Sequence, residues 1–191
     1  MFDTCHWHNE PQQWTLHDGT LDVVTDKNTD FWRETYYGFE RDSGHLFGAK
    51  VTGDFTASFR IQASYESLYD QAGIMVRIDE RRWIKGGIEL SDGAACIGSV
   101  LTVDRSDWST AAYDGRPEDF YLRVTVKNGV LRLQFSADGK RWPLLRLCPF
   151  PNAQSYLVGP MCCTPEREGL QVRFSEFQVG PPLDKALHDL S

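Results

Sequence analysis

The richest set of side chains that could do chemistry in this sequence lies between residues 70 and 90. The stretch reads as two strands joined by a charged turn, and successive side chains of a strand point to opposite faces. One face would be apolar, with Ala72, Ile74, Val76, Ile78, Ile84, Ile88 and Leu90. The other face would carry Gln71, Gly73, Met75, Arg77, Trp83, Lys85, Gly87 and Glu89. An indole, cations, an acid and an amide on one face indicate a surface that binds a polar ligand.

The register of these two strands decides which polar side chains are neighbours, because directly opposed residues of an antiparallel pair share a face. One register opposes Arg77 to Trp83 and Gln71 to Glu89. A register one step over would set Arg77 against Lys85, which is unfavourable because both side chains are cations. We therefore predict the first register, in which Arg77 stacks on Trp83 in a cation–π contact worth roughly 0.5–2 kcal/mol.

The same register opposes two interior glycines, Gly73 and Gly87. Glycine weakens the middle of a strand, so a pair of glycines at this point needs a structural reason. Close approach by a ligand or by another backbone is one reason, and a tight bend in a curved sheet is the other. The sequence leaves both open.

Two other stretches could bring rings and acids beside this face. Residues 30–39 hold five aromatic side chains, and residues 104–109 combine acids and hydroxyls with an indole. Loops held by a rigid sheet commonly carry binding groups, although the same rings could instead cap the core. Together the stretches give eight candidate ligand-binding residues: Trp32, Gln71, Arg77, Trp83, Lys85, Glu89, Asp107 and Trp108.

Catalysis on this face would need a second acid beside Glu89. Glycoside hydrolysis uses two carboxyl groups roughly 5–5.5 Å apart for retention, or about 6.5–9.5 Å apart for inversion. Asp70 or Asp107 could serve only if the fold brings one of them to Glu89, so Glu89, Asp70 and Asp107 are candidates and no catalytic residue is assigned. The sequence has no His-Glu-x-x-His spacing, phosphate loop or dinucleotide fingerprint, and we therefore expect no metal site and no cofactor.

The elements that must position these residues are predicted to be strands throughout. Alternating segments recur at hairpin spacing and are separated by turn signals such as Asn128-Gly129, with no amphipathic helix and no internal repeat. The predicted strands are two within 70–90 and one each at 13–17, 20–25, 45–51, 55–64, 94–103, 120–127, 130–136, 141–144, 154–164 and 170–179. We predict an all-β, two-sheet antiparallel sandwich of jelly-roll type, with a single domain over residues 1–182 and a short tail at 183–191.

Composition narrows the class of partner and the compartment. The net charge of −7 argues against nucleic acid, which requires a concentrated basic surface. No apolar run reaches the roughly 18 residues of a membrane span, and no leader is recognised, so we expect a cytoplasmic protein. The five cysteines lack a disulfide spacing and are expected to be reduced and buried, with Cys162 and Cys163 pointing to opposite faces. The oligomeric state stays open.

Four motifs carry a resemblance to a known family. They are Thr29-Asp30-Phe31-Trp32, the run from Asp70 to Arg77, the run from Trp83 to Glu89, and Ser106-Asp107-Trp108-Ser109. The chain resembles, over about residues 14–179, the regulation-of-enolase-like proteins, a family of unknown function in the concanavalin A-like lectin/glucanase superfamily. The resemblance implies a jelly-roll sandwich with a concave sheet. It implies no settled activity, because the paired acids of the superfamily's glucanases are missing.

Three functions are consistent with these residues. The first is a non-catalytic module that binds a small saccharide, a sugar acid or another sugar-derived metabolite on the concave face. The second is a glycoside-acting enzyme with Glu89 and either Asp70 or Asp107 as acid and base. The third is a cytosolic regulator that binds a protein. A polar groove would favour the first function, and an exposed apolar patch near Met75 and Trp83 would favour the third.

Overall fold

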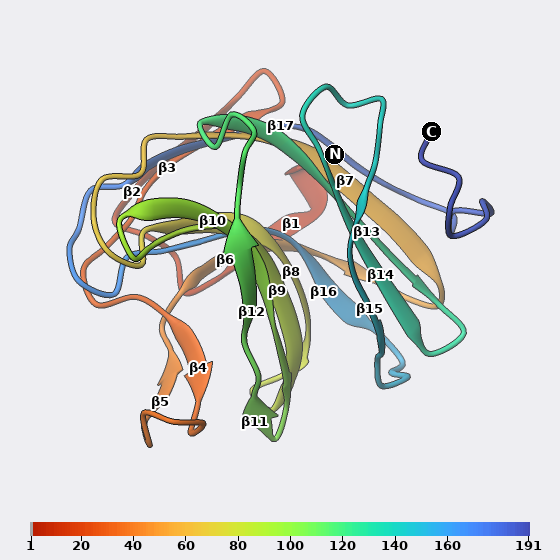
Figure 1. Ribbon diagram of the computed structural model, residues 1–191, viewed down its shortest axis with the longest axis horizontal. Helices are drawn as coiled ribbons and strands as arrows, with labels where there is room; N and C mark the ends of the chain where they lie inside the picture. The colour runs from red at the N-terminus through yellow and green to blue at the C-terminus, as the bar shows by residue number, and fades with distance from the viewer. Residues whose placement is uncertain (1) are drawn as a thin grey trace.

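The computed structural model describes residues 2–191, which form two large antiparallel sheets packed face to face (Figure 1). The first sheet has the order β1 (Cys5–His8), β6 (His45–Val51), β16 (Tyr156–Cys163), β8 (Gln71–Asp79), β9 (Arg82–Ser91), β10 (Ala94–Val103) and β11 (Arg105–Ser106), and β12 (Ser109–Ala112) also pairs with β10. The second has the order β15 (Leu144–Pro149), β14 (Val130–Ser136), β13 (Asp119–Lys127), β7 (Phe55–Ala63), β17 (Gln171–Gly180), β3 (Thr20–Val24) and β2 (Gln13–His17). A separate hairpin joins β4 (Phe31–Arg33) to β5 (Glu40–Asp42), and a single 3-10 turn, η1 (Phe2–Thr4), precedes β1. The predicted jelly-roll sandwich is confirmed.

The main core lies between the two sheets and follows the alternation seen in the sequence. Phe55, Phe59 and Ile61 point inward from β7, while Ile74 and Val76 point inward from β8. Removing these side chains from water supplies the main stabilisation of the sandwich, at roughly 25 cal/mol for each Å² of apolar surface. Because one face of β8 and β9 packs in this core, only the opposite face can contribute to a binding site.

The predicted register of β8 and β9 is confirmed. Arg77 lies opposite Trp83, Gly73 opposite Gly87, and Gln71 opposite Glu89. The glycines serve a close approach of backbones. A Cβ atom on Gly73 would lie within 3.0 Å of the carbonyl oxygen of Gly86, and one on Gly87 within 3.0 Å of the carbonyl oxygen of Ala72. Close approach of the neighbouring strand's backbone is therefore the reason for glycine at these two positions.

We expect Gly73→Ala or Gly87→Ala to lower the free energy of unfolding by about 1–3 kcal/mol, because the added methyl group can fit only if backbone shifts. Urea denaturation measures the effect. Gly180→Ala is the matched control, since a Cβ atom there meets nothing within 4 Å. Equal stability of all three variants would contradict the close approach.

The outer face of the first sheet is half covered by the β4–β5 hairpin. Apolar side chains from the hairpin and the sheet form a second cluster of Phe31, Trp32, Leu46, Met75, Trp83, Val100, Met161 and Cys163. Trp83 is only 1% exposed beneath this cover. Figure 1 shows the hairpin projecting from the body of the molecule at lower left.

The sequence did not predict five short strands, β1, β4, β5, β11 and β12. Each has two to four residues, too few to show a period, and each is defined by pairing with a partner elsewhere or across a loop. Residues 5–8, for example, pair with β6 about 40 positions later in the chain. Such pairing cannot be read from local pattern alone.

All five cysteines are free thiols, and four of them are buried as expected, whereas Cys96 is half-buried. Cys162 lies in the core between the sheets, whereas Cys163 points the other way into the cluster under the hairpin. The two adjacent residues therefore fill two different apolar clusters.

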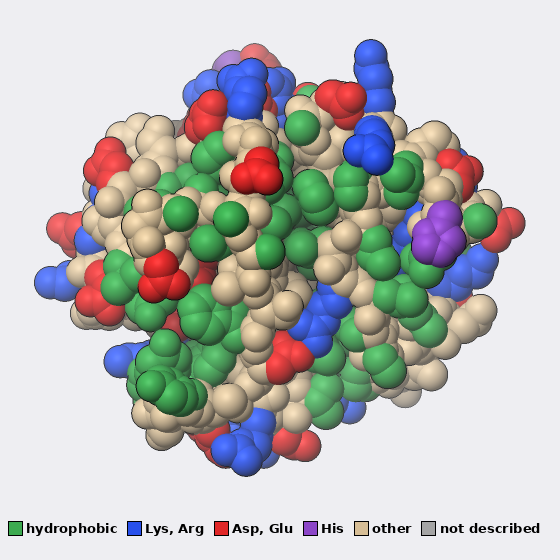
Figure 2. Space-filling model, viewed as in Figure 1, with side chains coloured by type: hydrophobic (Ala, Val, Ile, Leu, Met, Phe, Trp, Pro, Cys, Tyr) green, Lys and Arg blue, Asp and Glu red, His purple; other side chains and the backbone are tan. Residues whose placement is uncertain are grey.

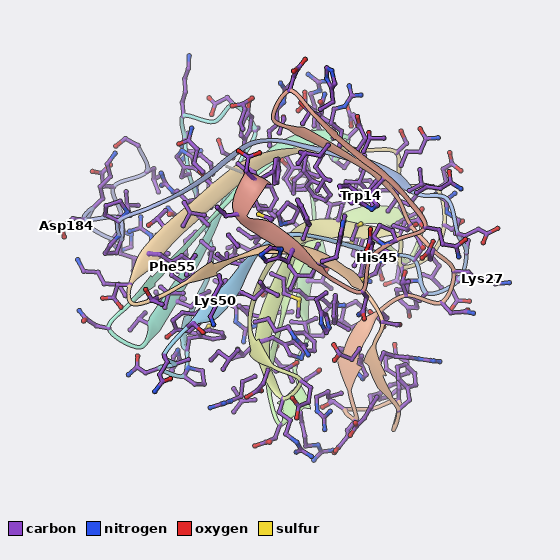
Figure 3. The ribbon with its side chains drawn as sticks, turned by 180° about the vertical axis from the view of Figure 1, so that it is seen from behind. Trp14, Lys27, His45, Lys50, Phe55 and Asp184 are labelled. Atoms are coloured by element: carbon purple, nitrogen blue, oxygen red, sulfur yellow. The ribbon has the colours of Figure 1, made fainter. Side chains whose placement is uncertain are left out.

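His45 ties the start of β6 to two loops. It is buried, it lies just after the β4–β5 hairpin, and Figure 3 shows it near Trp14. The N–H of Asp26 donates to its Nε2 at 3.1 Å, so Nδ1 carries the proton and donates to the carbonyl oxygen of Asn9 at 2.8 Å. Burial lowers the pKa of His45, although the Asn9 hydrogen bond and the charge of Asp26 oppose the change.

Because this pKa is lower in the folded than in the unfolded chain, folding stability should fall as pH drops below about 6.5. Urea denaturation at pH 7.5 and pH 5.5 should show a smaller pH dependence in His45→Gln than in the unaltered protein. His17→Gln, at an exposed position, is the control. An unchanged pH dependence in His45→Gln would contradict the neutral buried imidazole.

Candidate functional site

A cavity of about 310 Å³ lies where the hairpin leaves the outer face of the first sheet uncovered. Its walls are rings from the hairpin and from two loops: Trp32, Tyr37, Phe39, Tyr69 and Trp108. Its polar side chains are Asn28, Asp30, Arg41, Gln71, Lys85, Glu89 and Glu166, and Val100 and Pro165 complete the lining. Figure 2 shows hydrophobic side chains gathered at the end of the hairpin, at lower left.

Lys85 is the central polar group of this site. Its side chain is buried, and its Nζ donates to Oδ1 of Asp30 at 2.9 Å and to Oε1 of Gln71 at 2.7 Å. Burial by itself would lower the pKa of Lys85, but the charges of Asp30 and Glu89 and the hydrogen bond to Asp30 outweigh it and raise the pKa. The ammonium therefore stays charged, and one of its three protons is not used by Asp30 or Gln71.

Glu89 lies four residues after Lys85 on the same face of β9, with Gly87 between them, and opposite Gln71. Burial raises its pKa to about 7, the charge of Lys85 lowers it, and the charge of Asp30 raises it. Within residues 2–191 its carboxyl group has no hydrogen-bond partner. A carboxyl group that titrates near neutrality, free to accept or donate, thus lines the cavity.

The rings form two groups that meet across the cavity. Tyr37 stacks on Phe39 with centroids 5.3 Å apart and meets Trp32 edge-on at 5.7 Å. Tyr69 lies edge-on to Trp108 at 6.5 Å. The hydroxyl groups of Tyr37 and Tyr69 are 3.4 Å apart and connect the two groups.

The structure brings most of the predicted binding residues together. Those that line the cavity are Trp32, Gln71, Lys85, Glu89 and Trp108. Those that do not are Arg77, Trp83 and Asp107.

Each of the three residues outside the cavity has a structural partner. The Arg77 guanidinium binds both carboxylate oxygens of Asp42 at 3.0 and 2.8 Å, in place of the predicted stack on Trp83. Trp83 lies in the cluster beneath the hairpin. Asp107 pairs with Arg146 and accepts the N–H of Leu101 at 2.7 Å.

The predicted acid partners of Glu89 do not line the cavity. Arg167 donates to both carboxylate oxygens of Asp70, and the N–H groups of Glu66 and Ser67 donate to the same carboxylate. Burial alone would raise the pKa of Asp70, but these hydrogen bonds and the Arg167 charge lower it. Asp107 is held by Arg146. Both carboxylates therefore serve loop structure in this fold.

Sequence reasoning missed Asp30 as the partner of Lys85, and also Arg41 and Tyr69. Once the hairpin covers this face, Lys85 needs a nearby carboxylate, because burying an unpaired charge is costly. This requirement predicts an acidic partner for Lys85 but does not identify the residue. Asp30 is 55 positions away, and only the seating of the hairpin identifies it.

Within residues 2–191 no group of three or more His, Cys, Asp or Glu side chains is arranged to hold a metal ion. In the same residues no helix is long and apolar enough to cross a membrane.

Comparison with known proteins identifies the family. The family model described as "Protein of unknown function (DUF1349)" matches residues 7–182. The chain belongs to this family. It is also 61% identical over 185 residues to a Saccharomyces cerevisiae protein named "Regulation of enolase protein 1", covering 97% of this chain and 93% of the yeast protein. The regulation-of-enolase-like resemblance is thereby confirmed.

Solved structures agree on the fold. The crystal structure of a functionally unknown protein from Saccharomyces cerevisiae has a TM-score of 0.94 at 58% identity, covering 95% of this chain and 98% of that chain. A mutant of the Bacillus licheniformis GH43 protein BlXynB has a TM-score of 0.73 at 13% identity, over 92% of this chain and 36% of that chain. The exoplasmic/lumenal domain of VIP36, in a form bound to Ca2+ and Man3GlcNAc, has a TM-score of 0.55 at 10% identity, over 99% and 88% of the chains. At such identities the last two show the fold alone.

The charges around Glu89 give a direct test of the site. Its carboxyl group should titrate near pH 7 in carbon NMR spectra, with Glu89→Gln identifying the signal. Asp30→Asn should lower this pKa by removing a like charge, and Lys85→Met should raise it by removing a cation. Asp18→Asn, in an exposed turn, should leave it unchanged. Titration of Glu89 near pH 4.5 in the unaltered protein would contradict the buried arrangement.

Proposed function

We propose that the cavity binds a small saccharide, or a sugar-derived metabolite such as a sugar acid, without changing it chemically. The observation that carries the proposal is the Lys85–Glu89 pair. Lys85 keeps one proton to donate, and the carboxyl group of Glu89 is free of hydrogen-bond partners in the described chain. A donor beside an acceptor suits two neighbouring hydroxyl groups of a sugar.

The ring walls support the same class of ligand. The faces and edges of Trp32, Tyr37, Phe39, Tyr69 and Trp108 offer apolar surface for the C–H groups of a sugar, while the floor is polar. Small-molecule sites combine mostly apolar walls with a few placed polar groups, in volumes of about 300–1,000 Å³. The volume of about 310 Å³ suits a ligand of one or two sugar rings.

The fold supports a carbohydrate ligand only by analogy. Its structural neighbours include a lectin-like domain bound to Man3GlcNAc and a GH43 protein. Functions are grafted onto folds, so this likeness adds to the argument from the cavity and does not replace it. We keep a cytoplasmic location as part of the proposal, in keeping with the five free thiols.

The glycoside-acting alternative is less well supported. It would use Glu89 with Asp70 or Asp107, but those two carboxylates are engaged with Arg167 and Arg146. Asp30 contributes a charge near Glu89, and it is held by Lys85.

Binding of a protein partner is a second candidate because the end of the hairpin carries exposed rings, with Tyr36 93% exposed. The yeast relative is named for regulation of enolase, which is compatible with a protein partner. An exposed apolar patch near Met75 and Trp83, which would favour a protein partner, is absent from the surface of the described residues because both side chains are buried under the hairpin.

A panel of neutral saccharides and sugar acids tests the binding proposal, with tryptophan fluorescence and calorimetry as readouts. Trp108→Ala and Glu89→Gln should each weaken binding at least tenfold, or about 1.4 kcal/mol, because each removes a contact inside the cavity. Leu147→Ala, at an exposed position on β15, should bind as the unaltered protein does. Products released from an oligosaccharide would favour the glycoside-acting alternative, and no response to any member of the panel would refute the proposal.

A further inference from the structure

Two arginines lie buried side by side on the outer face of the second sheet. Arg123 on β13 is 9% exposed and Arg132 on β14 is 8% exposed. Arg123 pairs in register with Gln134, and Thr125 pairs with Arg132. The two guanidinium groups therefore occupy diagonal positions on one face of the sheet.

The partners of both guanidinium groups are neutral. Nε of Arg123 donates to Oε1 of Gln134 at 3.2 Å, and its guanidinium carbon lies 4.3 Å from the centre of the Trp142 ring. Arg132 donates to the carbonyl oxygens of Lys185 at 3.1 Å and of Asp189 at 3.4 Å. Nη2 of Arg123 and Nε of Arg132 are buried and have no hydrogen-bond partner in the described chain.

Other arginines on this sheet have the carboxylate partner that Arg123 and Arg132 lack. Arg60 binds both carboxylate oxygens of Asp119, and Arg173 binds both of Asp22. Within residues 2–191, no carboxylate oxygen lies within 4.0 Å of a guanidinium nitrogen of Arg123 or Arg132. Burial and the neighbouring charge of Arg132 lower the pKa of Arg123 to about 10, while the charge of Asp189 opposes them.

The C-terminal segment, residues 183–191, covers this face through hydrogen bonds and an ion pair to residues far away in the chain. The N–H of Leu183 donates to Thr56 Oγ1 at 2.8 Å, the N–H of Trp142 donates to the carbonyl oxygen of Leu190 at 2.8 Å, and Lys127 pairs with Asp184 at 3.0 Å. The segment lies on the opposite side of the molecule from the β4–β5 hairpin in Figure 1, and Figure 3 shows Asp184 at the molecular edge.

A cavity of about 360 Å³ opens between this segment and the ends of β13 and β14. Three of its lining side chains are cations, Lys127, Arg132 and Lys185, against the single acid Asp184. The chain as a whole has a net charge of −7, whereas the side chains that line this groove have a net positive charge. The positive charge of the groove favours binding of an anion.

We propose that the groove under the C-terminal segment is an oxyanion site, with Arg132 as its anchor and Lys127 on β13 beside it. The ligand is a small molecule that carries a phosphate or carboxylate group. A guanidinium fork binds such groups through two parallel hydrogen bonds, which are stronger than bonds to neutral carbonyl groups. The oxyanion replaces the carbonyl oxygens of Lys185 and Asp189 on Arg132, supplies the counter-charge that both arginines lack, and displaces the segment.

The experiment titrates the full chain separately with inorganic phosphate and with succinate, at ionic strength held constant with KCl. Calorimetry measures binding, and hydrogen exchange measures protection of residues 183–191. Saturable binding of either anion, with faster exchange in that segment, is expected. Preference for phosphate would point to a phosphorylated ligand, and preference for succinate would point to a carboxylate.

The variants separate this site from general charge effects. Arg132→Gln should weaken binding at least tenfold because Arg132 lines the groove, whereas Arg173→Gln, also on the second sheet, should leave it unchanged. Arg132→Lys keeps the positive charge and loses the fork, so it tests the site even if Arg132→Gln does not fold, and it should also bind more weakly. No saturable binding of either anion, or binding by Arg132→Lys as strong as that of the unaltered protein, would overturn the proposal.

Discussion

The pairing of the buried Lys85 ammonium with Asp30 is the interaction on which the candidate site depends. An ammonium group taken out of water costs several kcal/mol unless an opposite charge and hydrogen bonds replace the water. Lys85 on β9 finds these at Asp30, which begins the β4–β5 hairpin, and at Gln71 on the neighbouring strand β8. The hairpin must therefore pack against the first sheet to supply the carboxylate that stabilises the buried Lys85 ammonium.

A second ion pair holds the other strand of the hairpin. Arg77 on β8 binds Asp42 at the end of β5 through two hydrogen bonds. Burial would raise the pKa of Asp42, but the hydrogen bonds and charges of His8 and Arg77 lower it. With both strands clamped, apolar side chains such as Met75 and Trp83 become a closed cluster, while Glu89 is left beside an open, ring-walled cavity. Part of the outer face of the first sheet is thus buried in an apolar cluster, and the rest lines the candidate binding cavity.

Charge compensation distinguishes the two polar regions of the molecule. Lys85 is matched by Asp30, so the surplus group in the first cavity is an acid, Glu89, whose pKa is raised to about 7. On the second sheet, Arg123 and Arg132 have no matching carboxylate, so the surplus there is positive. The same rule, that a buried charge requires a partner, makes one region suited to hydroxyl groups and the other suited to an anion.

The sequence by itself determined the features that depend on local pattern. Alternation in β7, β8, β9, β13 and β14 and turn signals such as Asn128-Gly129 predict the sandwich, and the repulsion between Arg77 and Lys85 selects the register that the structure has. It also identified Gln71, Lys85 and Glu89 as members of one polar face. Only the tertiary structure decided that Trp83 lies under a cover, that Arg77 belongs to Asp42, and that Asp30 joins Lys85. These outcomes depend on where a hairpin of three-residue strands packs on a sheet whose strands lie 30 or more positions away in the chain. Local sequence pattern does not specify such long-range contacts.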